Sequence, residues 1–205
     1  MKNKFTEIFN RNGWGCDESV SGPSSTLART TNLRHSLPLL LEKYKIEVFF
    51  DAPCGDFNWM KKIIKNLEVH YIGADIVSEI VKNNTKQYGS DTVRFLELDL
   101  TTDAFPTADM MLCRDMLFHF SYLDTKRFFE RFFDSNIPLL LTTSHNNPKG
   151  FKNKDIATGG WRYMDLRIDP YNIKVGPLET IRDGNDRVLY LWDRVSLINS
   201  MQKFM

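Results

Sequence analysis

The chain has 205 residues, of which 42% are hydrophobic and 26% charged, and its formal net charge is +1 at pH 7. These values are typical of one globular domain with a full core, and they give no sign of a nucleic-acid partner. The longest apolar runs are too short to cross a bilayer, the N-terminus lacks the apolar core of a signal peptide, and three widely spaced cysteines favour reduced thiols. We therefore expect a cytoplasmic protein without membrane insertion.

The first 45 residues precede the first predicted strand. They contain a helix candidate at 4–11, a turn-rich stretch at 21–25 and a second helix candidate at about 26–44, which includes Pro38. A proline inside a helical pattern either kinks the helix or marks the start of a new one. We expect residues 1–45 to form a helical lid.

From residue 46 onward, short apolar runs alternate with segments suited to helix. Strands are predicted at 46–51, 69–74, 92–98, 108–113 and 137–143, and helices at 57–67, 77–87 and 122–134. Alternating strands and helices indicate a parallel sheet with right-handed crossovers. A final hairpin is predicted from 178–181 and 188–195. The expected fold is α/β and Rossmann-like: a seven-stranded, mostly parallel sheet with an antiparallel C-terminal strand and helices on both faces.

The stretch 49–60 joins a strand to a helix through a tight turn. The strand reaches Asp51, the turn runs through Pro53-Cys54-Gly55, and the next strand ends in Asp75. A carboxylate at the end of that second strand can accept hydrogen bonds from the two hydroxyls of a ribose. A dehydrogenase would need Gly-x-Gly-x-x-Gly, whereas this turn has one glycine, so pyrophosphate binding is disfavoured. The pattern predicts a nucleoside site.

Four motifs in order resemble those of the class I S-adenosylmethionine-dependent methyltransferase family: 51–56, Asp75, 95–100 and 109–115. The resemblance covers about residues 46–143. It implies the fold of that family, the cofactor S-adenosylmethionine and the product S-adenosylhomocysteine. A narrower set resembles the methyltransferases found among bacterial capsule and surface-polysaccharide genes; it consists of Ser21-Gly22-Pro23, Pro53-Cys54-Gly55-Asp56, Arg114-Asp115 with His119, and Thr158-Gly159-Gly160-Trp161-Arg162.

The resemblance implies roles for the acids and the turn. Asp51 would accept from the ammonium of the methionine portion and Asp75 from the ribose hydroxyls. Asp99 would accept from the adenine amine, with the Leu100 amide as a donor to the ring. The small residues of the turn would let the ligand approach the backbone closely. The full expected cofactor set is Asp51, Ala52, Pro53, Cys54, Gly55, Trp59, Asp75, Ile76, Asp99, Leu100 and Arg114.

His119 is the first candidate for a general base, because a hydroxyl acceptor must lose its proton during methyl transfer. Asp115 stands four residues earlier, so a helical turn would place both on one face and let the carboxylate orient the imidazole. Packing of His119 beneath the following helix is an equally good interpretation. His145, after the fifth strand, is the second candidate, and its alternative is a solvated loop histidine.

The acceptor pocket is expected to be built from the lid and a polar loop at 144–172. Trp161 and Arg162 could form a lip that stacks on a sugar and binds an anion, although a loop anchor explains the pair equally well. No tight spacing of His, Asp or Cys residues demands a metal, and none is expected. The expected substrate contacts are Trp14, Ser21, Arg29, Trp161 and Arg162.

We thus expect one methyltransferase domain at 1–205, with a cofactor-binding core at 46–143 and C-terminal strands at 173–205. The predicted function is S-adenosylmethionine-dependent O-methylation of a sugar, a nucleotide sugar or a sugar-derived precursor of a bacterial surface polysaccharide. Two alternatives stay open: N-methylation of a small amine or phospho-amine, and cofactor binding without catalysis. Nucleic-acid methylation is disfavoured because the sequence has no Asn-Pro-Pro-Tyr-like motif and no basic face.

Overall fold

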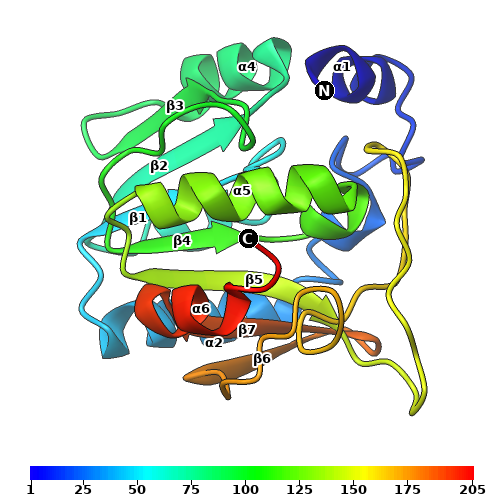
Figure 1. The fold of residues 1–205 in the computed structure, drawn as a ribbon. Coiled ribbons are helices and arrows are strands. Elements are labelled where there is room, and N and C mark those ends of the chain that lie inside the picture. The colour runs from blue at the N-terminus through cyan, green and yellow to red at the C-terminus, as the bar shows by residue number, and fades with distance from the viewer. The chain divides into compact units, whose positions relative to one another are not determined.

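The computed structural model describes residues 1–205 and contains seven strands: β1 (Val48–Asp51), β2 (His70–Asp75), β3 (Val93–Glu97), β4 (Met110–Cys113), β5 (Leu139–His145), β6 (Glu179–Asp183) and β7 (Arg187–Asp193). Their order in the sheet is β3-β2-β1-β4-β5-β7-β6 (Figure 1). Strand β7 is antiparallel to β5 and to β6, whereas the pairs β1–β2, β2–β3 and β4–β5 are parallel. The predicted α/β fold with a mostly parallel sheet is confirmed. The chain divides into two compact units, Met1–Asp99 and Leu100–Met205, so the single domain stays a prediction.

The first unit contains β1, β2 and β3, with helices before and between them. The helical elements are α1 (Lys2–Asn10), the 3-10 turn η1 (Pro23–Ser25), α2 (Thr31–Lys43), α3 (Lys61–Ile64) and α4 (Ser78–Tyr88). Helix α4 packs against β2 and β3 (Figure 1). Helix α2 continues through Pro38 and begins later than the sequence predicted.

The predicted helix at 57–67 is wrong in extent, because only Lys61–Ile64 is helical. Phe57 has a φ of 58°, which lies in the left-handed region and outside the range of an α-helix. Its ring packs on Tyr71 and Phe95 instead, with centroid distances of 5.0 and 5.2 Å. The packing of this ring therefore explains why Phe57 has a left-handed backbone in place of the helix that the sequence pattern predicted.

The second unit contains β4 to β7, the 3-10 turn η2 (Leu117–His119) and helices α5 (Tyr122–Asp134) and α6 (Arg194–Met201). Helix α5 begins with an N-cap, since the side chain of Ser121 accepts from the Asp124 amide at 3.1 Å. The sequence prediction missed α6. This helix also begins with an N-cap: the side chain of Asp193 accepts from the Ser196 amide at 2.8 Å.

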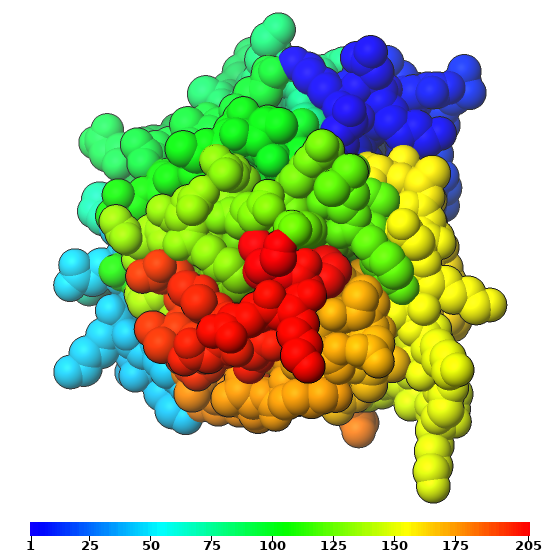
Figure 2. All heavy atoms as spheres, in the orientation of Figure 1, coloured from blue at the N-terminus to red at the C-terminus, as the bar shows by residue number.

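Residues between β5 and β6 form no helix or strand, as their polar composition predicted. Figure 2 shows the yellow part of this loop at the surface of the molecule. Polar anchors hold the loop: the side chain of Asn153 donates to the carbonyls of Asp165 and Asp169 at 2.8 and 2.7 Å and accepts from the Asp165 amide at 2.9 Å. No helix of the chain combines the length and hydropathy that a bilayer crossing requires.

A buried ion pair ties the β6–β7 hairpin to the end of β4. The Arg114 guanidinium donates through Nε and Nη2 to the two carboxylate oxygens of Asp183, at 2.9 and 3.1 Å. Both side chains are buried. Two parallel bonds between a guanidinium and a carboxylate fix orientation as well as distance.

We expect Asp183→Ala to lower the free energy of unfolding by about 3–5 kcal/mol, because breaking a buried pair leaves a desolvated charge behind. Asp134→Ala is the matched control. Its pair with Arg131 is exposed, and such pairs contribute at most about 1 kcal/mol. Urea denaturation of both variants measures the difference; equal losses would contradict the structural role given to the buried pair.

Candidate functional site

The first unit places one carboxylate between the turns that follow β1 and β2. Asp75, the last residue of β2, accepts from the Gly55 amide through Oδ2 at 3.2 Å and from the Val77 amide through Oδ1 at 2.9 Å. A third hydrogen bond, from the Cys54 amide to the Ala74 carbonyl at 2.8 Å, joins the turn after β1 to the end of β2. The two turns are therefore joined around the Asp75 side chain.

Burial raises the pKa of Asp75 to about 6, although the hydrogen bonds from the Val77 and Gly55 amides oppose the shift. A second acid of the expected cofactor set lies nearby. Asp51, at the end of β1, is buried and accepts from the Tyr71 hydroxyl at 2.7 Å. Burial, followed by the charges of Asp75 and Asp51, raises the pKa of the Cys54 thiol, so this cysteine is a poor nucleophile.

The remaining members of the expected cofactor set are less closely gathered. Ala52 and Trp59 are buried, and Pro53 and Ile76 are half-buried in the two turns. Asp99 is half-buried two residues beyond the end of β3, and the neighbouring Leu98 amide donates to the Asp75 carbonyl at 3.0 Å. The second unit begins with Leu100, which is buried, and it also contains Arg114.

The lid segment is fastened to the first turn. The Asp56 carboxylate accepts from the Ser19 hydroxyl at 2.9 Å, the Val20 amide at 3.0 Å and the Ser21 hydroxyl at 3.2 Å. A Cβ built on Gly55 would lie 2.0 Å from Ser21 Oγ, and Gly55 has a φ of +55°. We expected a ligand to approach the backbone beside Gly55, but on this side Ser21 occupies that space. A glycine is therefore needed at this position for the lid to pack against the turn.

The other two lid residues expected to contact substrate also pack within the first unit. Trp14 packs against Gly22, because a Cβ on Gly22 would lie 2.9 Å from Trp14 Cβ. Arg29 is half-buried before α2, and its amide donates to the Thr26 hydroxyl at 3.3 Å. These placements make the lid a packed segment of the first unit.

In the second unit, His119 is buried and clamped by the loop. Its Nδ1 lies 2.6 Å from the Gly160 carbonyl oxygen, and its own carbonyl accepts from the Gly159 amide at 2.8 Å. Because a carbonyl only accepts, Nδ1 carries the proton. Burial lowers the pKa of His119 against the opposing effects of the Gly160 bond and the Asp115 charge. The neutral ring therefore has its lone pair on Nε2.

The predicted helical pairing of Asp115 with His119 is wrong. Asp115 has a φ of 54° and lies outside η2, and its carboxylate bonds to Arg187 Nη1 at 2.6 Å and to the Thr143 hydroxyl at 3.2 Å. Burial alone would raise the pKa of Asp115, but the guanidiniums of Arg114 and Arg187 outweigh it and hold this pKa below its ordinary value. Gly160, which the sequence did not single out as the partner, orients the imidazole instead.

His145, the second candidate base, is buried at the end of β5. Its Nδ1 lies 3.2 Å from the Met164 amide and 3.3 Å from the Met164 carbonyl. Its ring packs against Phe118 and Tyr163 at centroid distances of 5.1 and 5.2 Å. Burial lowers the pKa of His145. This environment makes His145 part of an aromatic cluster, which the interpretation as a solvated loop residue did not foresee.

The loop places its two expected substrate contacts on opposite sides. Trp161 is exposed, whereas Arg162 is buried. Arg162 donates to the Tyr171 hydroxyl at 2.7 Å and to the Lys154 carbonyl at 2.9 Å, and it stacks over the Tyr122 ring. Arg162 is thus an anchor of the loop, the alternative that the sequence left open. No group of three His, Cys, Asp or Glu side chains is arranged to hold a metal ion.

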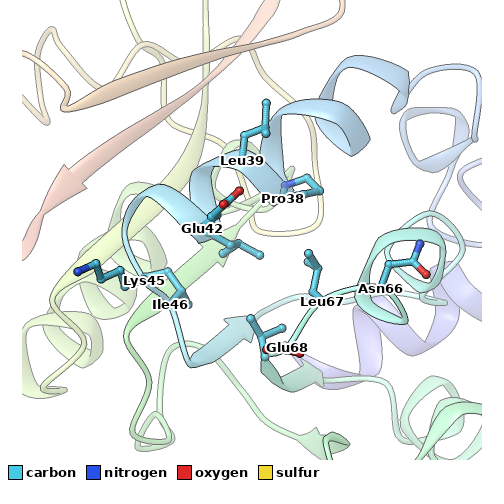
Figure 3. Close-up of a pocket in the computed structure, with 10 residues that line it drawn as sticks. Pro38, Leu39, Glu42, Lys45, Ile46, Asn66, Leu67 and Glu68 are labelled. Carbon is cyan, nitrogen blue, oxygen red and sulfur yellow. The ribbon is translucent and has the colours of Figure 1, made fainter.

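A separate pocket lies at the opposite ends of β1 and β2, where these strands begin (Figure 3). Its volume is about 280 Å³. Leu39, Ile46 and Leu67 supply apolar walls, and Glu42 and Lys45 supply charges. The pocket contains none of the expected cofactor or catalytic residues, so the candidate site is the region around Asp75.

No protein-family model matches the chain, and no curated protein matches its sequence. Solved methyltransferase structures do share its fold. Human N-acetylserotonin methyltransferase in complex with SAM is 14% identical, with a TM-score of 0.60 over 79% of this chain and 51% of that one. Magnesium protoporphyrin IX methyltransferase from Synechocystis PCC 6803 with bound SAH is 12% identical, with a TM-score of 0.65 over 95% and 100% of the two chains.

A third match is the N-methyltransferase NodS from Bradyrhizobium japonicum WM9 in complex with S-adenosyl-L-homocysteine, at 11% identity. Its TM-score is 0.65 over 93% of this chain and 98% of that one. The present chain spans about half the length of the human enzyme. At these identities, the likeness shows a common fold.

The raised pKa of Asp75 predicts a pH dependence of stability. Its folded value of about 6 exceeds the ordinary 3.8, so the ionised side chain destabilises the fold above pH 6, and this effect disappears as the pH falls towards 4. Relative to Asp75→Asn, the wild-type free energy of unfolding should rise by up to about 3 kcal/mol between pH 7.5 and 4. Urea titrations at both values measure it. If the wild-type free energy of unfolding relative to Asp75→Asn is independent of pH, or falls on acidification, the stabilisation of the carboxylate by the amide hydrogen bonds outweighs the cost of its burial.

Proposed function

We propose that this chain is an S-adenosylmethionine-dependent methyltransferase that O-methylates a sugar or sugar-derived precursor in bacterial surface-polysaccharide synthesis. The observation that carries the proposal is the buried Asp75 carboxylate between the Gly55 and Val77 amides, in a fold shared with methyltransferases crystallised with SAM or SAH. The choice of a sugar rests on the motif resemblance at Thr158–Arg162 and the neighbouring motifs.

The residues of the first unit fit the nucleoside. The two oxygens of Asp75 accept from the Gly55 and Val77 amides, and the Ile76 amide also acts on this carboxylate. An ionised carboxylate has about four acceptor sites, so capacity for a further bond remains. A ribose diol supplies hydroxyl donors that suit this capacity. The bound cofactor supplies an electrophilic methyl group on its sulfonium, while the protein residues bind and orient it.

Acceptor activation is assigned to His119. With the proton fixed on Nδ1 by the Gly160 carbonyl, the lone pair on Nε2 is in the form that takes a proton from a hydroxyl. The lowered pKa keeps His119 neutral at physiological pH. The clamp therefore prepares both the tautomer and the protonation state that a general base needs.

A hydroxyl acceptor is favoured over an amine by the charges of the second unit. An amine acceptor would gain from carboxylates placed to hold its cationic form. The buried carboxylates here, Asp165 and Asp183, and the half-buried Asp115 are each paired with an arginine. Their charge is compensated within the protein, so N-methylation remains the second choice.

We expect His119→Ala to lower turnover by roughly 10²–10⁴-fold, the usual contribution of a general base. The assay incubates the protein with S-adenosylmethionine and a panel of nucleotide sugars and detects the methylated product by mass spectrometry. In the wild type, kcat should rise with pH along a limb with its midpoint below about 6.5, the ordinary histidine value.

His35→Ala is the control, because His35 is exposed in α2. Affinity for S-adenosylhomocysteine should be the same in both variants. A near-normal rate for His119→Ala would remove the assigned base, and product on an amine acceptor with no product on any sugar would favour the N-methyltransferase.

A further inference from the structure

Two exposed aromatic rings stand side by side on the loop of the second unit. Trp161 is 52% exposed and Tyr163 is 47% exposed, and they are the only aromatics among the exposed large hydrophobic side chains of the chain. Their ring centroids are 4.7 Å apart at an interplanar angle of 73°. The two rings thus form a corner whose walls are nearly perpendicular.

Buried side chains support the corner formed by Trp161 and Tyr163. His145 meets both rings edge-on, at centroid distances of 6.1 Å to Trp161 and 5.2 Å to Tyr163. Phe118 packs against His145 at 5.1 Å. Arg162, between the two exposed residues, turns inward and is fixed by the Tyr171 hydroxyl and the Lys154 carbonyl. A ligand that stacks on such a corner has little side-chain entropy to remove.

The corner adjoins the candidate base. Gly160, whose carbonyl orients His119, directly precedes Trp161. Phe118, which directly precedes His119, lies 6.4 Å from the Trp161 ring by centroids. Exposed aromatics at this place are therefore neighbours of the group that would deprotonate the acceptor.

We propose that Trp161 and Tyr163 form the platform that binds the acceptor, and that a neutral pyranose ring lays its C–H face on the Trp161 indole while a hydroxyl of that ring reaches His119. This inference rests on the proposed function. A half-exposed corner suits a ring with one apolar face and wet hydroxyls, whereas a purely aromatic acceptor would favour an enclosed apolar pocket. Tyr163, rather than Arg162, is then the partner of Trp161.

The test labels the full chain with 5-fluorotryptophan, which gives one fluorine signal for each of its four tryptophans. Trp161→Phe assigns the Trp161 signal. Samples saturated with S-adenosylhomocysteine are titrated with a series of methyl pyranosides and with UDP-glucose; UDP and phenol are the comparison ligands. The Trp161 signal should shift saturably with the pyranosides or UDP-glucose, the signal of buried Trp192 should not move, and Tyr163→Ala should weaken the binding at least threefold.

The platform is overturned if no pyranoside or nucleotide sugar moves the Trp161 signal, or if UDP alone or phenol moves it as far as any sugar does. A different result would contradict the proposed function. The wild type would then show no binding of S-adenosylhomocysteine by calorimetry, whatever the sugars do to Trp161. A saturable sugar shift in that case supports the platform as a sugar site without methyl transfer.

Discussion

The hydrogen bonds that Asp75 accepts from the Gly55 and Val77 amides hold together the turns after β1 and β2. The carboxylate is buried, and burial raises its pKa to about 6. A buried acid close to its titration range is costly to keep ionised, and hydrogen-bond donors to its oxygens reduce that cost. Hydroxyl donors from a ribose would stabilise the charged form further. The same side chain that shapes the first unit is therefore suited to bind the nucleoside.

In the second unit, too, buried polar groups hold distant segments of the chain together. The pairs Arg114–Asp183 and Asp115–Arg187 connect β4 to the β6–β7 hairpin. The loop then reaches back to His119 through Gly159 and Gly160. A Gly159 φ of +91° is one that other residues rarely adopt, so this clamp depends on glycine there. Acceptor activation would thus depend on a loop without helix or strand of its own, which hydrogen bonds hold to the start of α5 and the end of β5.

Much of the fold was readable from the sequence because most of the strands contain short apolar runs, and β1 and β2 each end in an acid. The positions of Asp51 and Asp75 at the ends of β1 and β2 were predicted correctly for this reason. The shortness of α3 was missed because the left-handed backbone of Phe57 follows from ring packing across the unit. Contacts between segments distant in sequence have no signal in local periodicity.

The candidate site was likewise predicted only in part. The sequence indicated which residues lie there, but it did not indicate which way their side chains point or what they contact. Arg162 turns inward to Tyr171, and Ser21 fills the space beside Gly55. The i, i+4 spacing of Asp115 and His119 suggested a pairing, yet Asp115 bonds to Arg187, which lies 72 residues away. Trp161 and Tyr163 are exposed and Arg162 is buried, which is the reverse of what apolar and polar alternation in the sequence favours.

In the proposed function, the Asp75 carboxylate binds the ribose of an adenosyl cofactor. Calorimetric titration of the full chain with S-adenosylhomocysteine tests it most directly, with Asp75→Ala as the variant and Asp91→Ala, at an exposed residue, as the control. We expect the wild type and the control to bind, and Asp75→Ala to bind at least about tenfold more weakly, which is the effect of losing charged hydrogen bonds. Equal affinities in all three proteins, or no binding by the wild type, would contradict it.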